Sequence, residues 1–132
     1  MTIDCVLDTS ALLAYLRDEP GADKVATSLE GDECVKHVVN AGEFLYSVSR
    51  RMPDRFTPES AAVWLESTAI GKSANMTMSL LVLAARIRRA VPALSFGDGM
   101  AIALASTLRV PVLTTEKAFR AAADFAAIDL IR

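Results

Sequence analysis

Short apolar runs alternate with longer segments of helical periodicity along the whole chain. The apolar runs have the length and the β-branched content of buried strands, and they cover residues 3–7, 34–39, 110–115 and 127–131. Residues 74–76 are a candidate for a short edge strand. Between them apolar residues recur every three or four positions, which predicts helices over residues 10–17, 22–29, 40–51, 58–70, 79–90, 98–108 and 116–123. This alternation favours the α/β class, with a central, mostly parallel sheet of four to five strands flanked by helices.

Capping residues and prolines mark the ends of several predicted helices. Asn40 belongs to the residue types that cap helix N-termini, so we expect it to start the helix that ends near Arg51, before Pro53. Thr57 and Pro58 place a capping residue directly before a proline at the first helical position. These signals support a helix on each side of the 51–57 connection.

Length and composition indicate one compact domain over residues 1–132. Hydrophobic residues make up 52% of the 132 positions, which is typical of a folded protein with a single core. No apolar run approaches the roughly 20 residues of a membrane-spanning helix. The start of the chain lacks the basic flank and apolar stretch of a secretory signal, so we expect a cytoplasmic protein without membrane attachment.

The cysteine count and the net charge narrow the chemistry further. Cys5 and Cys34 both lie in apolar runs, and we expect buried free thiols rather than a disulfide. With one histidine and no Cys-x-x-Cys pair, the chain cannot assemble a structural zinc site. A net charge of −2 excludes a protein that is basic all over, but it leaves a nucleic-acid partner open.

Four acidic residues lie at the ends of predicted strands or near the beginnings of predicted helices. Asp8 follows the first strand, Glu43 lies one turn into the helix after the second, Asp98 opens a helix, and Glu116 follows strand 110–115. Ligands of open α/β sheets bind outside the carboxyl ends of the strands. We therefore expect these four carboxylates to converge at one edge of the sheet.

Each acid alone has a simple structural explanation. Asp8 and Asp98 could cap helices, and Glu43 could be a solvated surface residue. Glu116 could be an acid in the first turn of a helix, where the helix dipole favours a negative charge. Four acids at one edge need a further explanation, because converging carboxylates repel one another by several kcal/mol unless a cation lies between them. Oxygen ligands without histidine or cysteine select Mg²⁺ or Mn²⁺, and such ions typically support phosphoryl displacement by an activated water.

The stretches around these acids resemble the PIN-domain ribonucleases, and among them the VapC-type toxins of bacterial type II toxin–antitoxin systems. The matching segments, in family order, are "VLDTSALLAYLRDEPG", "VVNAGEFLYSVSRR", "ALSFGDGMAIALA" and "VPVLTTEKAF". The resemblance implies a PIN fold, Mg²⁺-dependent cleavage of RNA such as tRNA or rRNA, a small antitoxin partner and a homodimer. Mn²⁺ is the substitute ion that it implies.

The resemblance also implies roles for particular residues. Asp8 and Asp98 would ligate Mg²⁺ directly, while Glu43 and Glu116 would act through water. Glu116 departs from the aspartate that is commoner in the family at this position, which makes its contact with the ion indirect. The hydroxyl residues beside these acids would support them by hydrogen bonds: Thr9, Ser10, Thr114 and Thr115.

Basic residues at two helix ends are candidates for binding RNA phosphates. They are Arg50 and Arg51 in one helix and Arg86 and Arg89 in another. Solvated cations near helix C-termini are an equally good explanation for either group.

Two other functions fit part of the pattern. A catalytically inactive PIN-like module could use the same acids only to bind RNA or protein. A receiver-like phosphoacceptor domain also places aspartates at strand ends, but it needs an adjacent early pair, and Asp4 and Asp8 are not adjacent.

Overall fold

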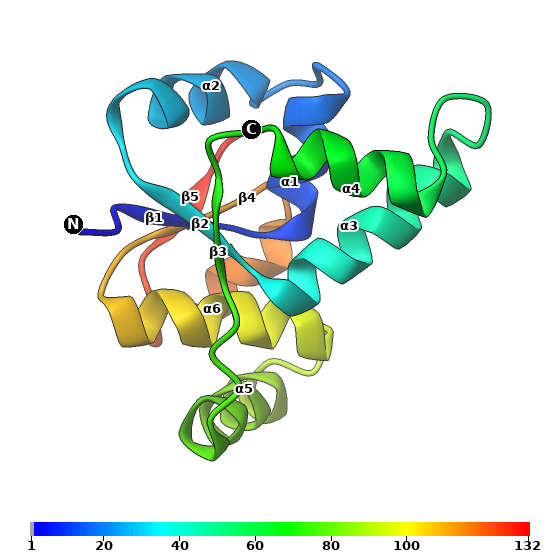
Figure 1. Cartoon of the computed structure of the whole chain (residues 1–132). Helices are drawn as coiled ribbons and strands as arrows, with labels where there is room; N and C mark the ends of the chain where they lie inside the picture. Colours follow the sequence, from blue (N-terminus) through cyan, green and yellow to red (C-terminus); the bar gives the residue numbers. More distant parts are fainter. Residues whose placement is uncertain (1) are drawn as a thin grey trace.

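The computed structural model describes residues 2–132 and contains one five-stranded sheet in which all paired strands are parallel. The strands are β1 (Cys5–Leu7), β2 (Cys34–His37), β3 (Gly71–Ser73), β4 (Val112–Thr114) and β5 (Ile128–Leu130). They lie side by side in the order β3-β2-β1-β4-β5 (Figure 1). The predicted α/β class and the strand count are confirmed.

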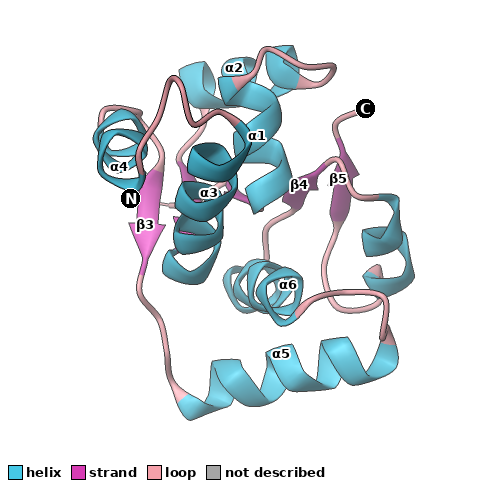
Figure 2. Cartoon of the chain, turned by 90° about the vertical axis from the view of Figure 1, so that its right-hand side faces the viewer, coloured by secondary structure: helices cyan, strands magenta, loops and turns pink. Residues whose placement is uncertain are grey.

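Helices cover both faces of this sheet. They are α1 (Thr9–Leu16), α2 (Ala22–Gly31), α3 (Val38–Arg51), α4 (Pro58–Glu66), α5 (Met78–Ala90), α6 (Phe96–Leu108) and the short 3₁₀ helix η1 (Lys117–Ala122). In Figure 2, α5 and α6 lie on one side of the strands, and α1 and α3 lie on the other. The domain therefore has three layers.

The strand sequences explain the two-sided burial. Val6 of β1 packs into the core beneath α5 and α6, whereas Cys5 and Leu7 pack into the opposite core with Phe44. Side chains of successive strand residues point to opposite faces, so a strand covered on both sides is apolar at every position. This is why β1 is a continuous apolar run rather than an alternating one; β2 is also buried at all four positions, but two of them are the polar residues Lys36 and His37.

The N-terminus of α3 corrects the expectation that Asn40 caps this helix. The helix begins at Val38, and His37 is the capping residue because its Nδ1 accepts a hydrogen bond of 3.0 Å from the backbone N–H of Val39. The other ring nitrogen, Nε2, donates to the carbonyl of Asn75 at 2.8 Å. Asn40 lies within the first turn and is fully buried, which frees its side chain for another role.

Two other boundaries differ from the prediction. The helix that begins at Pro58 is capped by Thr57 as expected, in a capping box with Ser60, but it ends at Glu66 rather than near residue 70. The edge strand lies at Gly71–Ser73 instead of 74–76, where it pairs with β2. The prediction failed here because β3 is exposed and short, so hydrophobicity gives it no signal.

The strand order creates a topological switch point at the centre of the sheet. From β1 the chain moves to β2 and β3 on one side, and it then returns to β4 and β5 on the other. Ligand-binding crevices form outside the carboxyl ends of strands at such a reversal, here between β1 and β4. The order also differs from the 2-1-3-4-5 order of receiver-like domains, so the receiver-like alternative is wrong.

Cys5 and Cys34 are free thiols buried on neighbouring strands, paired in register across β1 and β2. The expectation of buried thiols is confirmed. Among residues 2–132, no helix combines the length and the apolar character that crossing a bilayer requires.

Candidate active site

Asp8 occupies the switch point, at the junction of β1 and α1. It caps α1, and its Oδ1 accepts hydrogen bonds from the backbone N–H of Ala11 at 2.9 Å and from Ser10 Oγ at 2.7 Å. Its Oδ2 accepts a bond of 2.8 Å from Thr114 Oγ1, at the end of β4. Asp8 thus joins the two strands that border the crevice.

Burial dominates the electrostatics of Asp8. The residue is only 1% exposed, and the loss of solvent raises its pKa from 3.8 to about 7. The hydrogen bonds from Ala11, Ser10 and Thr114 oppose this rise in the pKa, and the nearby charge of Asp98 adds slightly to it. None of the three ion pairs within residues 2–132 involves Asp8. A buried carboxylate without a cationic partner is costly at neutral pH.

Glu43 reaches the same region from the second turn of α3. Its Oε1 accepts hydrogen bonds from Asn40 Nδ2 at 3.2 Å and from Thr9 Oγ1 at 3.3 Å. Burial raises the pKa of Glu43, and the charge of Asp98 raises it further against the effect of the hydrogen bonds. The carboxylate is therefore held in place from both α1 and α3.

Asn40 and Gly97 complete this arrangement, and the sequence alone did not single them out for it. Asn40 Nδ2 also donates to the carbonyl of Gly97 at 3.1 Å, which ties α3 to the first turn of α6. A Cβ atom at Gly97 would overlap Glu43 Oε1 and lie 2.6 Å from Oε2. Asn40 Oδ1 is buried and has no hydrogen-bond partner among residues 2–132. Only glycine at position 97 leaves room for the glutamate in this position.

Asp98 lies in the first turn of α6, beside Gly97, and currently takes part in a capping box. Its Oδ2 accepts a hydrogen bond of 2.9 Å from the backbone N–H of Ser95, and Ser95 Oγ accepts one of 3.1 Å from the N–H of Asp98. Within residues 2–132, no three carboxylate, histidine or cysteine side chains gather closely enough to hold a metal ion. Asp8, Glu43 and Asp98 share one edge of the sheet, but in these side-chain positions they do not form a closed site.

Glu116 lies farther from the centre of this arrangement. It is exposed and precedes η1, and its backbone N–H donates to Thr114 Oγ1 at 3.0 Å. The neighbouring Thr115 contributes its backbone N–H, which donates to Ser10 Oγ at 2.9 Å. Of the four expected supporting hydroxyl groups, Thr9, Ser10 and Thr114 bond directly to an acid, whereas Thr115 acts through its main chain.

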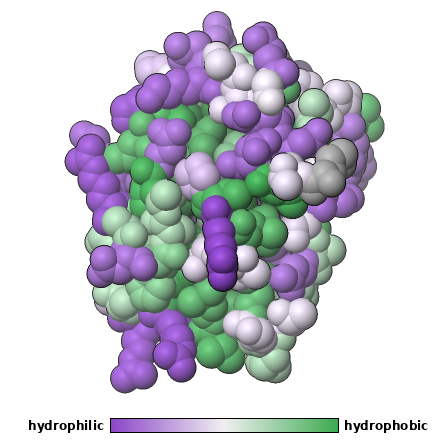
Figure 3. All heavy atoms as spheres, turned by 90° about the vertical axis from the view of Figure 1, so that its left-hand side faces the viewer, coloured by the Kyte–Doolittle hydropathy of each residue, from purple (hydrophilic) through white to green (hydrophobic). Residues whose placement is uncertain are grey.

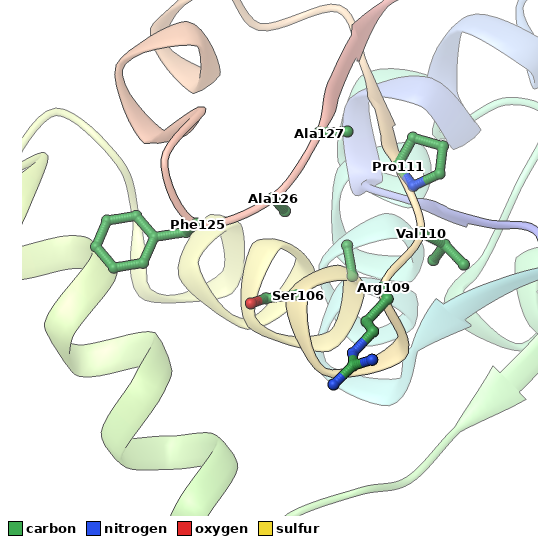
Figure 4. A pocket seen from close by; sticks show the side chains of 8 residues that line it. Ser106, Arg109, Val110, Pro111, Phe125, Ala126 and Ala127 are labelled. Atoms are coloured by element: carbon green, nitrogen blue, oxygen red, sulfur yellow. The ribbon is translucent and has the colours of Figure 1, made fainter.

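One cavity lies away from these acids. It has a volume of about 290 Å³ and lies between the end of α6 and the segments around Pro111 and Ala126, before β4 and β5 begin (Figure 4). Figure 3 shows the face opposite the carboxyl edge, where apolar side chains cover much of the centre. A second cavity of about 100 Å³ is smaller, but Ser10, Thr115 and Glu116 line it. Chemistry, rather than volume, identifies the functional edge of the sheet.

The arginine candidates separate in the structure. Arg51, at the end of α3, lines the small cavity beside Ser10. Arg50 instead stacks over Tyr46, with 5.7 Å from its guanidinium carbon to the ring centroid. Arg86 and Arg89 are exposed on α5, on the other side of the sheet.

The chemistry of the acids fits a hard divalent cation. Asp8 and Glu43 are desolvated oxygen donors, and none of the ion pairs formed by residues 2–132 neutralises them. The partnerless Asn40 Oδ1 adds a buried polar atom to the same region. Mg²⁺ is bound by one or two carboxylates and retains several waters, so it needs fewer protein ligands than zinc or calcium. Asp8 and Asp98 would hold such an ion, with Glu43 beside them.

Comparison with known proteins identifies the family. The PIN domain model matches residues 5–124 of the chain. The chain belongs to the PIN domain family. No curated protein sequence matches it.

Solved structures support the same fold for this PIN domain. VapBC-1 from nontypeable Haemophilus influenzae is 15% identical, with a TM-score of 0.70 over 98% of this chain and 100% of that one. VapBC2 from Rickettsia felis, solved with a promoter DNA fragment, is 10% identical, with a TM-score of 0.70 over 96% and 98%. A toxin–antitoxin complex from Klebsiella pneumoniae is 14% identical, with a TM-score of 0.68 over 88% and 90%. At these identities the similarity establishes the fold.

Proposed function

We propose that this PIN domain is a Mg²⁺-dependent endoribonuclease that acts as the toxin of a type II toxin–antitoxin pair. The observation that carries the proposal is the pair of desolvated, cation-free carboxylates Asp8 and Glu43 at the β1–β4 switch point, with Asp98 next to them. PIN domains are generally nucleases, which agrees with such a site. RNA is the substrate, with tRNA or rRNA as the expected target, and Mn²⁺ is the substitute ion.

The residues of the chain would divide the work as follows. Asp8 and Asp98 would hold the ion, and Ser10, Thr114 and the backbone N–H of Ala11 fix the orientation of the Asp8 carboxylate. Glu43, fixed by Thr9 and Asn40, orients a water for in-line attack on the phosphodiester. Glu116 acts through water at the rim. When bound, Mg²⁺ supplies an acidified water and offsets charge on the phosphoryl group.

The partners in this proposal follow from the structural neighbours. Several of them come from VapBC or toxin–antitoxin complexes, so we expect a small antitoxin to bind this chain. The proposal also includes a homodimer and a cytoplasmic location, which the resemblance of the sequence to the VapC-type toxins suggests. The alternative is an inactive PIN-like module that binds RNA or protein. One observation favours it, because Asp98 is engaged in the capping box and the three acids do not form a closed site.

Cleavage of RNA by the purified chain separates the two functions. Antitoxin-free protein should cut single-stranded RNA with Mg²⁺ or Mn²⁺ and should stop when EDTA is added. Asp98→Asn should lower the rate by at least about a hundredfold, since it removes a charged ligand. Asp124→Asn, at an exposed aspartate after η1, is the matched control and should cut at the wild-type rate. Binding of RNA without metal-dependent cleavage would favour the inactive module instead.

A further inference from the structure

The small cavity beside the acids contains two arginines that the proposed nuclease chemistry does not use. It has a volume of about 100 Å³ and is lined by polar side chains from four separate segments: Ser10, Glu19, Arg51, Thr115, Glu116 and Arg132. The lining residue Ser10 contacts Asp8 directly, because its Oγ donates a hydrogen bond of 2.7 Å to Asp8 Oδ1. Anything bound in this cavity therefore lies directly next to the proposed cleavage centre.

The two arginines in this cavity differ in how they are engaged. Arg132 forms an ion pair with Glu19 at 3.9 Å, which is a long distance for such a pair. Glu19 also pairs with Arg17 at 3.9 Å, so its carboxylate is shared between two arginines. Arg51 takes part in none of the ion pairs found among residues 2–132. Two guanidinium groups, of Arg51 and Arg132, and two carboxylates, of Glu19 and Glu116, line the cavity. The guanidinium group of Arg51 is therefore the one in this cavity that is not held in an ion pair within residues 2–132.

The position of Arg51 along α3 indicates which part of a strand it would meet. Eight residues separate Glu43 from Arg51, and at 1.5 Å per residue this is about 12 Å along the helix. A single phosphate group is too small to touch both residues. A nucleic-acid strand whose reactive phosphate lies at the acids would therefore bring a neighbouring phosphate to Arg51.

The size and the lining favour a phosphate over a base. The cavity is well below the roughly 300–1,000 Å³ of sites that enclose drug-sized ligands. No aromatic side chain lines it, so it lacks the platform on which bases stack in single-strand binding sites. An arginine fork in a small polar cavity suits a compact anion that accepts two hydrogen bonds.

We propose that Arg51, with Arg132 beside it, binds a phosphate of the RNA strand adjacent to the phosphate that is cut. This assignment rests on the proposed ribonuclease function and adds a subsite to it. Arg51 then positions the strand and takes no part in the bond-breaking step. Of the four arginines expected at helix ends, it is the one that the geometry assigns to RNA.

A pair of matched variants tests this subsite. Arg51→Gln removes the charge but keeps a long polar side chain at an exposed helix end, so the fold should be unaffected. Arg109→Gln removes the same charge at the opposite end of the sheet, beside the larger cavity. The affinity of each full-length protein for a fluorescent single-stranded RNA is measured in EDTA by anisotropy, between 50 and 200 mM salt.

Loss of one phosphate contact has a defined signature. Arg51→Gln should weaken RNA binding by about tenfold and lower the slope of log K against log[salt] by about 0.7. In Mg²⁺ it should raise KM with little change in kcat, because a contact made equally before and during the reaction affects binding alone. Arg109→Gln should match the wild type in both measurements.

The possible failures are distinguishable. If the wild type cleaves RNA but Arg51→Gln binds with the same affinity and salt slope as Arg109→Gln, the subsite is wrong and the ribonuclease function stands. If in addition Arg51→Gln weakens the complex with the antitoxin, the cavity receives a protein side chain rather than RNA. A wild-type protein that neither binds nor cleaves RNA would overturn the proposed function and the subsite together.

Discussion

Replacing Asp8 with asparagine should stabilise the metal-free protein at alkaline pH. The folded-state pKa of about 7 lies about three pH units above the ordinary value of 3.8, and each unit corresponds to 1.36 kcal/mol. The folded state therefore binds more protons than the unfolded state between these values. The ionised Asp8 lowers the free energy of unfolding by about 4 kcal/mol above pH 7, and this penalty disappears toward pH 4.

Asparagine keeps most of the hydrogen bonds that Asp8 makes. Its carbonyl can accept from Ser10 and Ala11, while its NH₂ group faces Thr114 Oγ1, which must then accept instead of donate. Thr114 can turn its proton toward Ser10 Oγ, 3.2 Å away. Allowing about 1 kcal/mol for this rearrangement, the net gain at pH 8 is about 3 kcal/mol. For a domain of this size the corresponding rise in Tm is about 10 °C.

Thermal melts in EDTA at pH 8 and pH 4.5 measure this effect. The variant Asp8→Asn should melt about 10 °C higher than the wild type at pH 8, and the two should melt at nearly equal temperatures at pH 4.5. Asp124→Asn serves as the surface control and should stay within about 2 °C of wild type at both values. An Asp8→Asn protein that is less stable than wild type at pH 8, or a gap independent of pH, would refute the burial argument.

Two further experiments address the geometry and the biology of the site. Gly97→Ala should displace the Glu43 carboxylate and abolish RNA cleavage with little change in Tm. Gly42→Ala is the control and should keep full activity, because a Cβ atom at this position meets nothing within 4 Å. Equal activity of the two variants would show that Glu43 is not needed in this position. Expression of the wild-type protein without its antitoxin should arrest bacterial growth, and Asp98→Ala should relieve the arrest; continued arrest by a folded Asp98→Ala protein would contradict the catalytic role of this residue.

The strands and most helices could be predicted because buried parallel strands and amphipathic helices leave strong periodic signals. The acids could be located for a related reason: a residue that follows a parallel strand lies at a fixed edge of the sheet. Asp8 and Thr114 illustrate this, since they are 106 residues apart in sequence and 2.8 Å apart in space. The exposed strand β3 carries no such signal, so its position was predicted a few residues too late.

The details of the site depended on contacts that local sequence does not encode. Asn40 is a residue type that often caps helices, but His37 takes the capping position of α3. Asn40 instead bonds both to Glu43 and to Gly97, which is 57 residues farther along the chain. The sequence predicted repulsion among the acids, and the pKa is indeed raised at Asp8 and Glu43. The main cause of this rise is burial rather than mutual repulsion, and burial becomes known only when the layers are assembled.

The capping box at the start of α6 has a consequence for ion affinity. Asp98 closes the N-terminus of its own helix through Ser95, and with this side-chain position no three acids gather in residues 2–132. An ion that draws Asp98 Oδ2 away from the N–H of Ser95 breaks a hydrogen bond worth about 1 kcal/mol, which lowers the apparent binding constant of the ion roughly fivefold. The start of α6 and the ion compete for one carboxylate. A sequence change that gave the N-terminus of α6 another hydrogen-bond partner in place of Asp98 would therefore tighten ion binding from outside the site.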